Sequence, residues 1–166
     1  FEDKIYVLEN YDMHLAKHLV AGVDVWLNNP RRPYEASGTY GQKVPCNGGI
    51  NLSISDGWWP EAFNGQNGWV IGEEKEYENY EIQDKVDSEY LYDILESQVL
   101  PLFYNRDENG IPHGWIKMMK QSMATIIPQF STCRMVKEYF EKYYLPAMKL
   151  SETFKQNNYE LAKSIS

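Results

Sequence analysis

The sequence is poor in cysteine and has no long hydrophobic run. Its two cysteines, Cys46 and Cys133, lie far apart without metal-ligand spacing, so we expect neither a disulfide framework nor a cysteine metal site. Reduced thiols are typical of cytoplasmic proteins. No segment approaches the roughly 20 apolar residues of a membrane span, and the first residues lack the pattern of a signal peptide. We therefore expect a cytoplasmic protein that does not interact with a membrane.

Basic residues are also scarce. Sixteen lysines and arginines stand against 24 acidic residues, which gives a formal net charge of −8. Because nucleic-acid binding needs a basic patch or stripe, we do not expect a nucleic-acid partner. The chain is nevertheless 43% hydrophobic and 14% aromatic, which excludes a disordered protein. With 166 residues it is long enough for one domain with a substantial core.

The first half of the chain alternates short strands with short helices, which predicts an α/β fold with a parallel sheet. Strands are expected at residues 5–8, 23–27 and about 50–54, and helices at residues 12–20 and 37–47. Because the chain leads at once into a strand, we expect it to begin within a domain. Ligands of parallel sheets bind beyond the carboxyl ends of the strands, where residues 28–39 and 55–60 would fall.

The second half has the periodicity of helices. We expect a loop at residues 56–67, a solvated connector at residues 73–85, and helices from about Asp87 to the end. One apolar stripe at helical spacing consists of Tyr90, Leu91, Ile94, Leu95 and Val99. This pattern predicts that residues 1–72 carry the chemistry and that residues 87–166 form a helical scaffold.

One segment combines the groups that a phosphate-bearing ligand requires. It reads Glu35-Ala-Ser-Gly-Thr-Tyr-Gly-Gln-Lys43. Small residues let backbone N–H groups approach an anion, and a helix start adds a favourable dipole. A carboxylate, such an anion site and an amine suit a sugar phosphate or pyridoxal phosphate. The alternatives are an ordinary serine-capped helix start, with Glu35 in a solvated loop and Lys43 on the surface.

This segment and several others resemble the α-glucan (glycogen, starch or maltodextrin) phosphorylases, and in particular their shorter bacterial and archaeal branch. The further segments are Glu9-Asn-Tyr11, Val23-Asp-Val-Trp-Leu-Asn-Asn-Pro-Arg-Arg-Pro33, Asn47-Gly48, Asp56-Gly-Trp-Trp59, Asn67-Gly-Trp69, Gly110-Ile-Pro-His-Gly-Trp115 and Tyr143-Tyr-Leu-Pro-Ala147. They run nearly from end to end of the chain. The resemblance corresponds only to the C-terminal part of a phosphorylase.

The resemblance implies a fold, a reaction and partners. The fold is the Rossmann-like C-terminal domain of a GT-B glycosyltransferase, and the cofactor is pyridoxal 5′-phosphate. The reaction is phosphorolysis of a terminal α-1,4-linked glucose of a glucan or maltodextrin by inorganic phosphate, giving glucose 1-phosphate with retained configuration. The other implied partner is the N-terminal remainder of a longer enzyme, and a homo-oligomer is left open.

The resemblance also implies a role for each residue of the cofactor site. Lys43 is the catalytic-site residue that tethers the cofactor, and a buried lysine would lose its proton readily enough to do so. Gly38 and Thr39 would donate backbone N–H groups, and Thr39 its hydroxyl, to the cofactor phosphate. Tyr11 falls where a phosphorylase tyrosine packs by the cofactor ring, although a core aromatic is the competing interpretation.

Four residues resemble the segment that holds the hydroxyls of the transferred glucose: Glu35, Ala36, Ser37 and Gly38. A carboxylate such as that of Glu35 accepts two hydroxyl hydrogen bonds, each strengthened by its charge.

Departures from the family pattern lie inside the key segment. The family usually has Gly or Ser where Tyr40 stands, Met where Gln42 stands, and Leu or Met where Cys46 stands. Pro45 removes one helical hydrogen bond and clashes with the carbonyl four residues back. We therefore expect a short or kinked helix beyond Lys43.

Two further residue pairs have competing interpretations. Trp58 and Trp59 would either stack on sugars or pack beneath their loop, and packing is expected for at least one. His14 and His18 share the spacing of zinc ligands on a helix, but the accompanying glutamate and a third ligand are missing. We therefore expect no metal site.

Arg31 and Arg32 stand between two prolines, which favours a positioned surface loop over phosphate contact. Because the opposing domain and a basic cluster for two phosphates are missing from this chain, it should not catalyse phosphorolysis alone.

Two functions of other classes remain open. A catalytically silent carbohydrate-binding or regulatory module would keep the fold without a cofactor. A nucleotide-sugar glycosyltransferase of the glycogen synthase type shares the architecture but uses no pyridoxal phosphate. Neither needs Lys43 for a cofactor, so the lysine distinguishes both from a phosphorylase.

Overall fold

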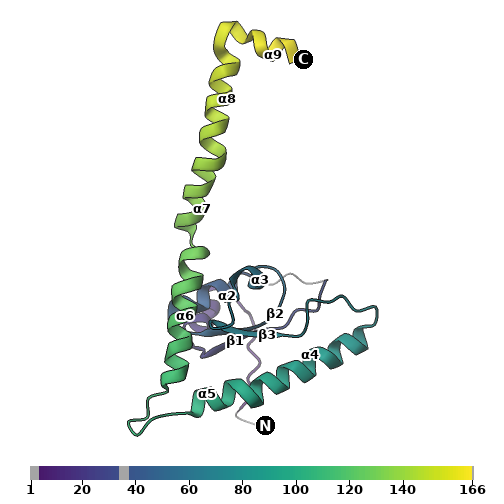
Figure 1. Cartoon of the computed structure of the whole chain (residues 1–166), viewed down its shortest axis with the longest axis vertical. Helices are drawn as coiled ribbons and strands as arrows, with labels where there is room; N and C mark the ends of the chain where they lie inside the picture. The colour runs from purple at the N-terminus through teal and green to yellow at the C-terminus, as the bar shows by residue number, and fades with distance from the viewer. Residues whose placement is uncertain (1–3, 34–37, 166) are drawn as a thin grey trace. The chain divides into compact units, whose positions relative to one another are not determined.

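The computed structural model of the chain describes residues 4–33 and 38–165. The chain divides into two compact units, unit 1 (Phe1–Ile127) and unit 2 (Pro128–Ser166) (Figure 1).

Unit 1 contains a small sheet and most of the helices that surround it. Its elements are α1 (Met13–Gly22), β1 (Val25–Asn28), α2 (Tyr40–Lys43), the 3-10 turn η1 (Val44–Asn47), β2 (Ile50–Ile54), α3 (Trp59–Ala62), β3 (Gly68–Ile71), α4 (Tyr80–Ile94), the π-helical turn η2 (Leu95–Val99), α5 (Leu100–Tyr104) and most of α6 (His113–Gln129).

The sheet has three parallel strands in the order β1-β2-β3. Val25 pairs with Ile50, and Leu52 pairs with Trp69. Every residue of β2 is buried because the strand is central and both of its faces are covered. The predicted α/β fold with a parallel sheet is therefore confirmed.

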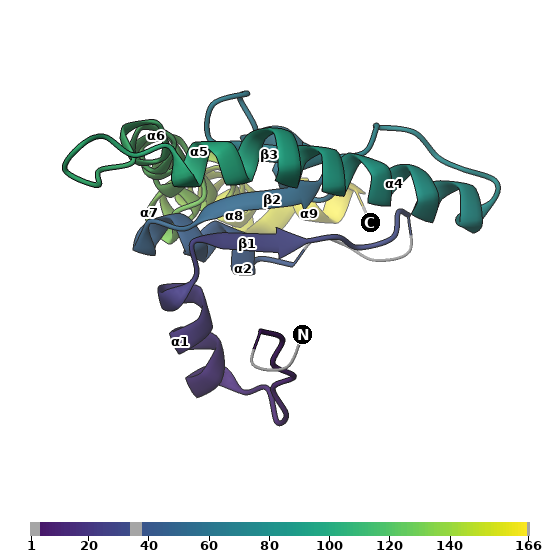
Figure 2. The same cartoon turned by 90° about the horizontal axis from the view of Figure 1, so that it is seen from below.

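Helices cover both faces of this sheet. In Figure 1, α4 and α5 lie on one side of the strands, and α2 and α3 lie on the other; Figure 2 likewise shows α2 and α4 on opposite sides. The hydrophobic core joins the sheet to the α4–α6 region and consists of Ile50, Leu52, Ile54, Trp69, Ile71, Ile94, Val99 and Trp115. On the opposite face, Asn51 and Trp58 pack near α2. The sheet thus supports α2, the helix that ends at Lys43.

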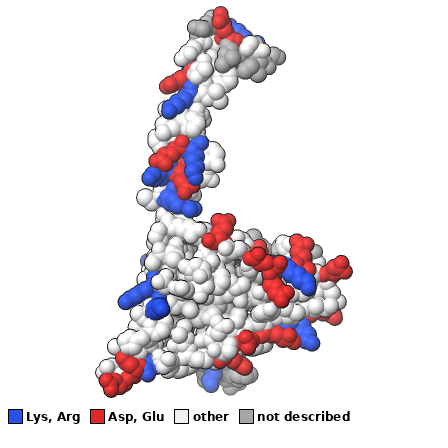
Figure 3. Space-filling view, in the orientation of Figure 1, with Lys and Arg blue, Asp and Glu red and all other residues white. Residues whose placement is uncertain are grey.

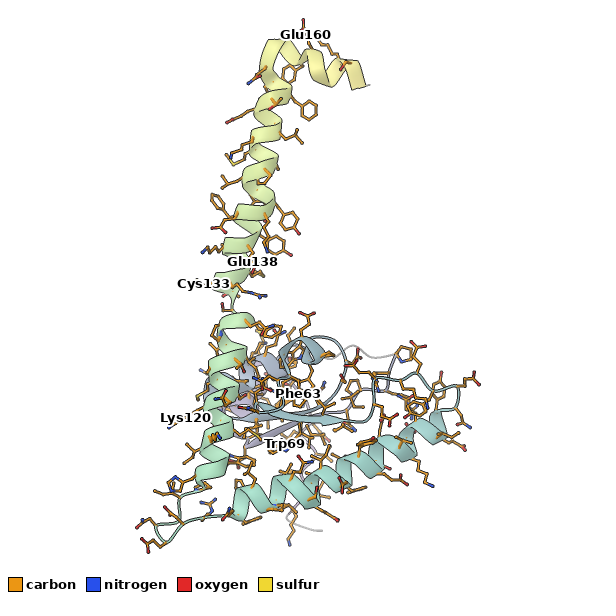
Figure 4. All side chains as sticks on the ribbon, viewed as in Figure 1. Phe63, Trp69, Lys120, Cys133, Glu138 and Glu160 are labelled. Atoms are coloured by element: carbon orange, nitrogen blue, oxygen red, sulfur yellow. The ribbon has the colours of Figure 1, made fainter. Side chains whose placement is uncertain are left out.

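Apart from Phe130 and Ser131, the described residues of unit 2 are helical. Its elements are α7 (Thr132–Tyr139), the π-helical turn η3 (Phe140–Tyr144), α8 (Leu145–Lys155), the 3-10 turn η4 (Gln156–Tyr159) and α9 (Glu160–Ile165). Ser131 caps α7, because its hydroxyl oxygen accepts a hydrogen bond from Arg134 N. Figure 4 shows the side chains of this unit projecting from its helices on several sides.

Several predicted elements are confirmed. The strand at residues 50–54 forms as predicted, and the strand predicted at residues 23–27 forms as β1. The first helix begins after Asp12, whose carboxylate accepts a hydrogen bond from Leu15 N at 2.8 Å. The helices predicted in the second half also form, although a loop separates α5 from α6.

The strand predicted at residues 5–8 is wrong. These residues form no strand, and the side chains of Ile5, Tyr6 and Val7 are 70%, 73% and 88% exposed. A strand needs a neighbour to satisfy its backbone groups, but the described strands pair only with one another.

Three boundaries also differ from the predictions. The second helix begins at Tyr40 rather than near residue 37. The connector predicted at residues 73–85 ends early, because the Asn79 side chain accepts a hydrogen bond from Glu81 N and starts α4 at Tyr80. The loop predicted at residues 56–67 contains the short helix α3, and β3 follows it unpredicted.

Acidic side chains gather over the part of unit 1 where β3 leads into α4 (Figure 3). This segment contains Glu73, Glu74, Glu76 and Glu78. Within residues 4–33 and 38–165, no helix is long and apolar enough to cross a bilayer.

Candidate functional site

Lys43 is the last residue of α2, a helix of only four residues. The chain tightens there into the 3-10 turn η1, with Pro45 at one of its first positions. The turn ends at Gly48, whose φ of +86° is the left-handed conformation that glycine adopts most easily. The expectation of a short helix beyond Lys43 is therefore confirmed.

Gly41 lets this short helix approach the sheet closely. A Cβ atom on Gly41 would lie 2.6 Å from Asn51 Oδ1 and 2.7 Å from Trp58 Cζ2. Asn51 Nδ2 also donates a hydrogen bond of 2.9 Å to the Gly41 carbonyl. These contacts fix the backbone two residues before Lys43 against β2.

One aromatic ring lies against the Lys43 amine, and two further rings pack on it. Lys43 Nζ lies 4.8 Å from the centroid of the Tyr40 ring, a cation–π distance. The Tyr40 ring stacks on Trp26 of β1, with centroids 6.0 Å apart and an interplanar angle of 27°. The Tyr11 ring meets Tyr40 edge-on, with centroids 5.9 Å apart. We call Tyr11, Trp26, Tyr40 and Lys43 the lysine cluster.

Tyr11 joins this cluster from the segment before α1. Desolvation, followed by the hydrogen bond and charge interaction with Tyr40, raises the pKa of the Tyr11 phenol. Its side chain is 49% exposed, so the competing interpretation of Tyr11 as a core aromatic is wrong. The structure thus brings Tyr11 close to Lys43, with Tyr40 between them.

Lys43 is exposed, which corrects the expectation that it is buried. The lysine lies at the end of a short surface helix, where the described residues cover only part of it. No described carboxylate forms an ion pair with it. The amine is therefore open to a ligand on its outer side.

Gly38 and Thr39 precede α2 and are also exposed. Thr39 occupies the position before the helix but makes no side-chain capping hydrogen bond. Among the described residues, a Cβ atom on Gly38 would meet only Tyr40 Cδ2, at 3.9 Å, so these residues leave space beside this backbone. Three of the predicted glucose-binding residues, Glu35, Ala36 and Ser37, lie outside the described residues.

The second region of interest is the edge where the parallel strands end. Arg32 Nη1 donates a hydrogen bond of 3.2 Å to the Ser55 carbonyl, and Ser55 Oγ donates one of 2.7 Å to Glu74. These contacts join the segments that follow all three strands. They confirm that residues after β1 and β2 meet at this edge.

The two arginines of this edge are held by α4. Arg31 forms a bidentate ion pair with Asp84, with Nη2–Oδ2 at 2.6 Å and Nε–Oδ1 at 3.0 Å. The Arg32 carbonyl accepts a hydrogen bond from Gln83 Nε2. These contacts confirm the prediction of a positioned loop.

Asp87 of α4 lies beside Arg32 in this region. Burial raises the pKa of its carboxyl, although the nearby Arg32 charge and a hydrogen bond from Gln83 act in the opposite direction. A cavity of about 640 Å3 lies alongside, between the loop after β1, the ends of β2 and β3, and one side of α4. This cavity is distinct from the lysine cluster.

The two tryptophans after β2 pack in the interior. Trp58 is 9% exposed and Trp59 is fully buried, with its Nε1 donating a hydrogen bond of 3.2 Å to the Trp69 carbonyl. Packing is therefore confirmed for both. The His14 and His18 rings lie 4.7 Å apart, and among the described residues no group of three or more His, Cys, Asp or Glu side chains could hold a metal ion.

Three residues of the candidate site were not predicted from the sequence: Tyr40, Asn51 and Trp26. Tyr40 precedes Lys43 by three positions, a spacing that places both on one helical face and would have indicated their contact. The only signal for Asn51 was its polar side chain between the apolar residues Ile50 and Leu52 of β2. No local signal connects Trp26 with Tyr40, since they meet through tertiary packing.

Comparisons with known proteins confirm the resemblance stated from the sequence. The chain is 48% identical over 166 residues to maltodextrin phosphorylase from Thermococcus litoralis, covering 100% of this chain and 19% of that protein. It is 48% identical over 149 residues to glycogen phosphorylase from Aquifex aeolicus, covering 90% and 21%. It is 47% identical over 144 residues to glycogen phosphorylase from Mycobacterium tuberculosis, covering 87% and 17%.

The chain therefore spans about a fifth of the length of these curated relatives. No protein-family model matches it. The comparisons show that the chain is homologous to a fragment of archaeal and bacterial phosphorylases.

Proposed function

We propose that this chain is the C-terminal portion of an α-glucan phosphorylase with GT-B architecture. Residues 1–72 would belong to its Rossmann-like catalytic domain and carry the cofactor site, and residues 87–166 would form a helical segment. The observation that carries the proposal is the 48% identity to maltodextrin phosphorylase over all 166 residues. The parallel order β1-β2-β3 is compatible with that architecture.

The proposed reaction is phosphorolysis. An oxygen of inorganic phosphate bonds to the anomeric carbon of the terminal glucose, and the α-1,4 glycosidic bond breaks. The glycosidic oxygen receives a proton and leaves with the shortened glucan, and glucose 1-phosphate forms with retained configuration. The N-terminal remainder of the enzyme would supply the opposing wall of the glucan site.

The residues around Lys43 fit pyridoxal 5′-phosphate. The exposed amine has an aromatic ring on one side and no acidic partner among the described residues. The described residues leave space beside the Gly38 backbone, as an approaching phosphate group requires. When bound, the cofactor would supply a phosphate group that gives and takes a proton during the reaction.

In this proposal the chain's own residues bind and orient the cofactor. Lys43 Nζ would bond to the cofactor's aldehyde carbon, and the aldehyde oxygen would leave as water. Gly38 and Thr39 would donate hydrogen bonds to the cofactor phosphate, and Tyr11 would lie beside its ring. Lys43 is thus a tether rather than a proton shuttle.

The transferred glucose would be held by the preceding segment. Its hydroxyls would contact Glu35, Ala36, Ser37 and Gly38. The carboxylate of Glu35 would form the strongest of these hydrogen bonds because it is charged.

The cytoplasm is the proposed location, where thiols such as Cys46 stay reduced. Cys46 and Cys133 are both free and exposed.

The test is to find the residue that carries the cofactor. The full-length protein that contains this chain should show cofactor absorbance, and borohydride reduction followed by peptide mapping should find the pyridoxyl group on Lys43. Lys43→Ala should abolish that label. Lys120→Ala, which alters an exposed lysine of α6 (Figure 4), should leave the label at Lys43.

A label on another lysine would contradict the assignment of Lys43. A protein without any cofactor would instead favour a silent carbohydrate-binding module or a nucleotide-sugar glycosyltransferase.

A further inference from the structure

We infer that Tyr40 is a positioning residue that forms one aromatic wall of the cofactor site. This inference rests on the proposed function, because it takes Lys43 as the attachment point.

The first step is the contact between Tyr40 and the attachment atom. Lys43 Nζ lies 4.8 Å from the Tyr40 ring centroid. The two residues belong to the same short helix, three positions apart, and this spacing places their side chains on one face. Tyr40 and Lys43 therefore keep their relative position as long as this helix is formed.

The second step is that the Tyr40 ring is held in place from two directions. Trp26 stacks against it with an interplanar angle of 27°, and Tyr11 meets it edge-on at 74°. Trp26 is half-buried in β1, so it belongs to the sheet rather than to a surface loop. Tyr40 is 37% exposed, but its ring cannot turn away without losing both aromatic contacts.

The third step follows from the structure of the cofactor. Its pyridine ring is joined to Nζ through a single carbon atom, so the ring must lie close to that nitrogen. Since Nζ itself is 4.8 Å from the Tyr40 centroid, a ring attached there can reach the separation of aromatic pairs, which is about 4.5–7 Å. An electron-rich phenol and an electron-poor pyridine ring suit such a contact.

The experiment uses the full-length protein in its cofactor-free form, titrated with pyridoxal 5′-phosphate. The fraction attached to Lys43 is trapped with borohydride and measured at each concentration. Tyr40→Leu should weaken binding by about two- to thirteen-fold, the equivalent of about 0.5–1.5 kcal/mol for an aromatic pair. Tyr40→Phe keeps the ring and should bind within about two-fold of the unaltered protein.

A second readout separates an aromatic wall from a merely structural role. At equal occupancy of Lys43, the visible circular dichroism of the bound cofactor should change in Tyr40→Leu and be kept in Tyr40→Phe. Tyr92→Leu makes the same substitution at a 63% exposed tyrosine of α4, on the other side of the sheet, and should change neither measurement (Figure 2).

Two results would overturn the inference. If Tyr40→Leu matched the unaltered protein in both affinity and circular dichroism, Tyr40 would not form a wall, while Lys43 would remain the attachment point. If the unaltered protein carried no cofactor on Lys43, the proposed function and this inference would both be wrong.

Discussion

Gly41→Ala should destabilise unit 1, because the short helix that ends at Lys43 packs against the sheet without room for a side chain. The added Cβ atom would lie 2.6 Å from Asn51 Oδ1 and 2.7 Å from Trp58 Cζ2. Both neighbours are buried, and the Asn51 amide is fixed by its hydrogen bond to the Gly41 carbonyl. Neither can move aside without losing contacts of its own.

Three effects set the magnitude of this change. Overpacking of a filled interior costs about 1–3 kcal/mol, and displacing the Asn51 amide from its acceptor costs about 1–3 kcal/mol more if it is left unpaired. Replacing a glycine by alanine restricts the unfolded chain and returns up to about 1 kcal/mol. We therefore expect Gly41→Ala to lower the free energy of unfolding by about 2 kcal/mol.

Urea unfolding followed by tryptophan fluorescence measures this loss. All five tryptophans fall within residues 1–127, so the signal reports unit 1 alone. Gly22→Ala is the matched control, because a Cβ atom on Gly22 would meet nothing within 4 Å. This control should change stability by less than about 1 kcal/mol.

Equal stability of the Gly41→Ala and Gly22→Ala proteins would refute this reasoning. It would mean that the helix that ends at Lys43 can move away from the sheet without cost.

Three further predictions concern charge and activity. Because burial raises the pKa of Asp87 against the opposing attraction of Arg32, the folded chain holds that proton more tightly than the unfolded chain. The free energy of unfolding should therefore fall as pH rises through the raised pKa, and urea titrations at several pH values should show a smaller fall in Asp87→Asn. In the full-length protein, Glu35→Gln should lower kcat/KM by about 100-fold or more, equivalent to about 2.7 kcal/mol, with unchanged cofactor content. Near-normal kinetics would make Glu35 an ordinary loop residue. The 166-residue chain alone should release no glucose 1-phosphate from maltodextrin and phosphate, since Arg31 is already paired with Asp84, and measured turnover would show that its site is complete.

The sequence by itself determined the features that depend on neighbouring residues. The strand predicted at residues 50–54 forms as β2, and Asp12 preceded the helical pattern of α1. Pro45 predicted the short helix, because its ring and missing N–H act within one turn. The segment that ends at Lys43 also carried the resemblance that the comparisons confirmed.

Local patterns were insufficient where an element needs a distant partner. Residues 5–8 have the apolar character of a strand, yet they form none because no described strand pairs with them. The strand β3 was not predicted, and its pairing with the buried strand β2 stabilises it. Hydrogen bonding across a sheet depends on which strands meet, and sequence periodicity does not contain that information.

The surroundings of Lys43 were decided only by the tertiary structure. Trp26 and Tyr40 are far apart in sequence but stack because β1 pairs with β2 and Asn51 of β2 holds the Gly41 backbone. The exposure of Lys43 likewise follows from how few described residues cover the end of α2. The sequence specifies which chemical groups are present. Their distances and exposure depend on the packing of segments that are distant in sequence.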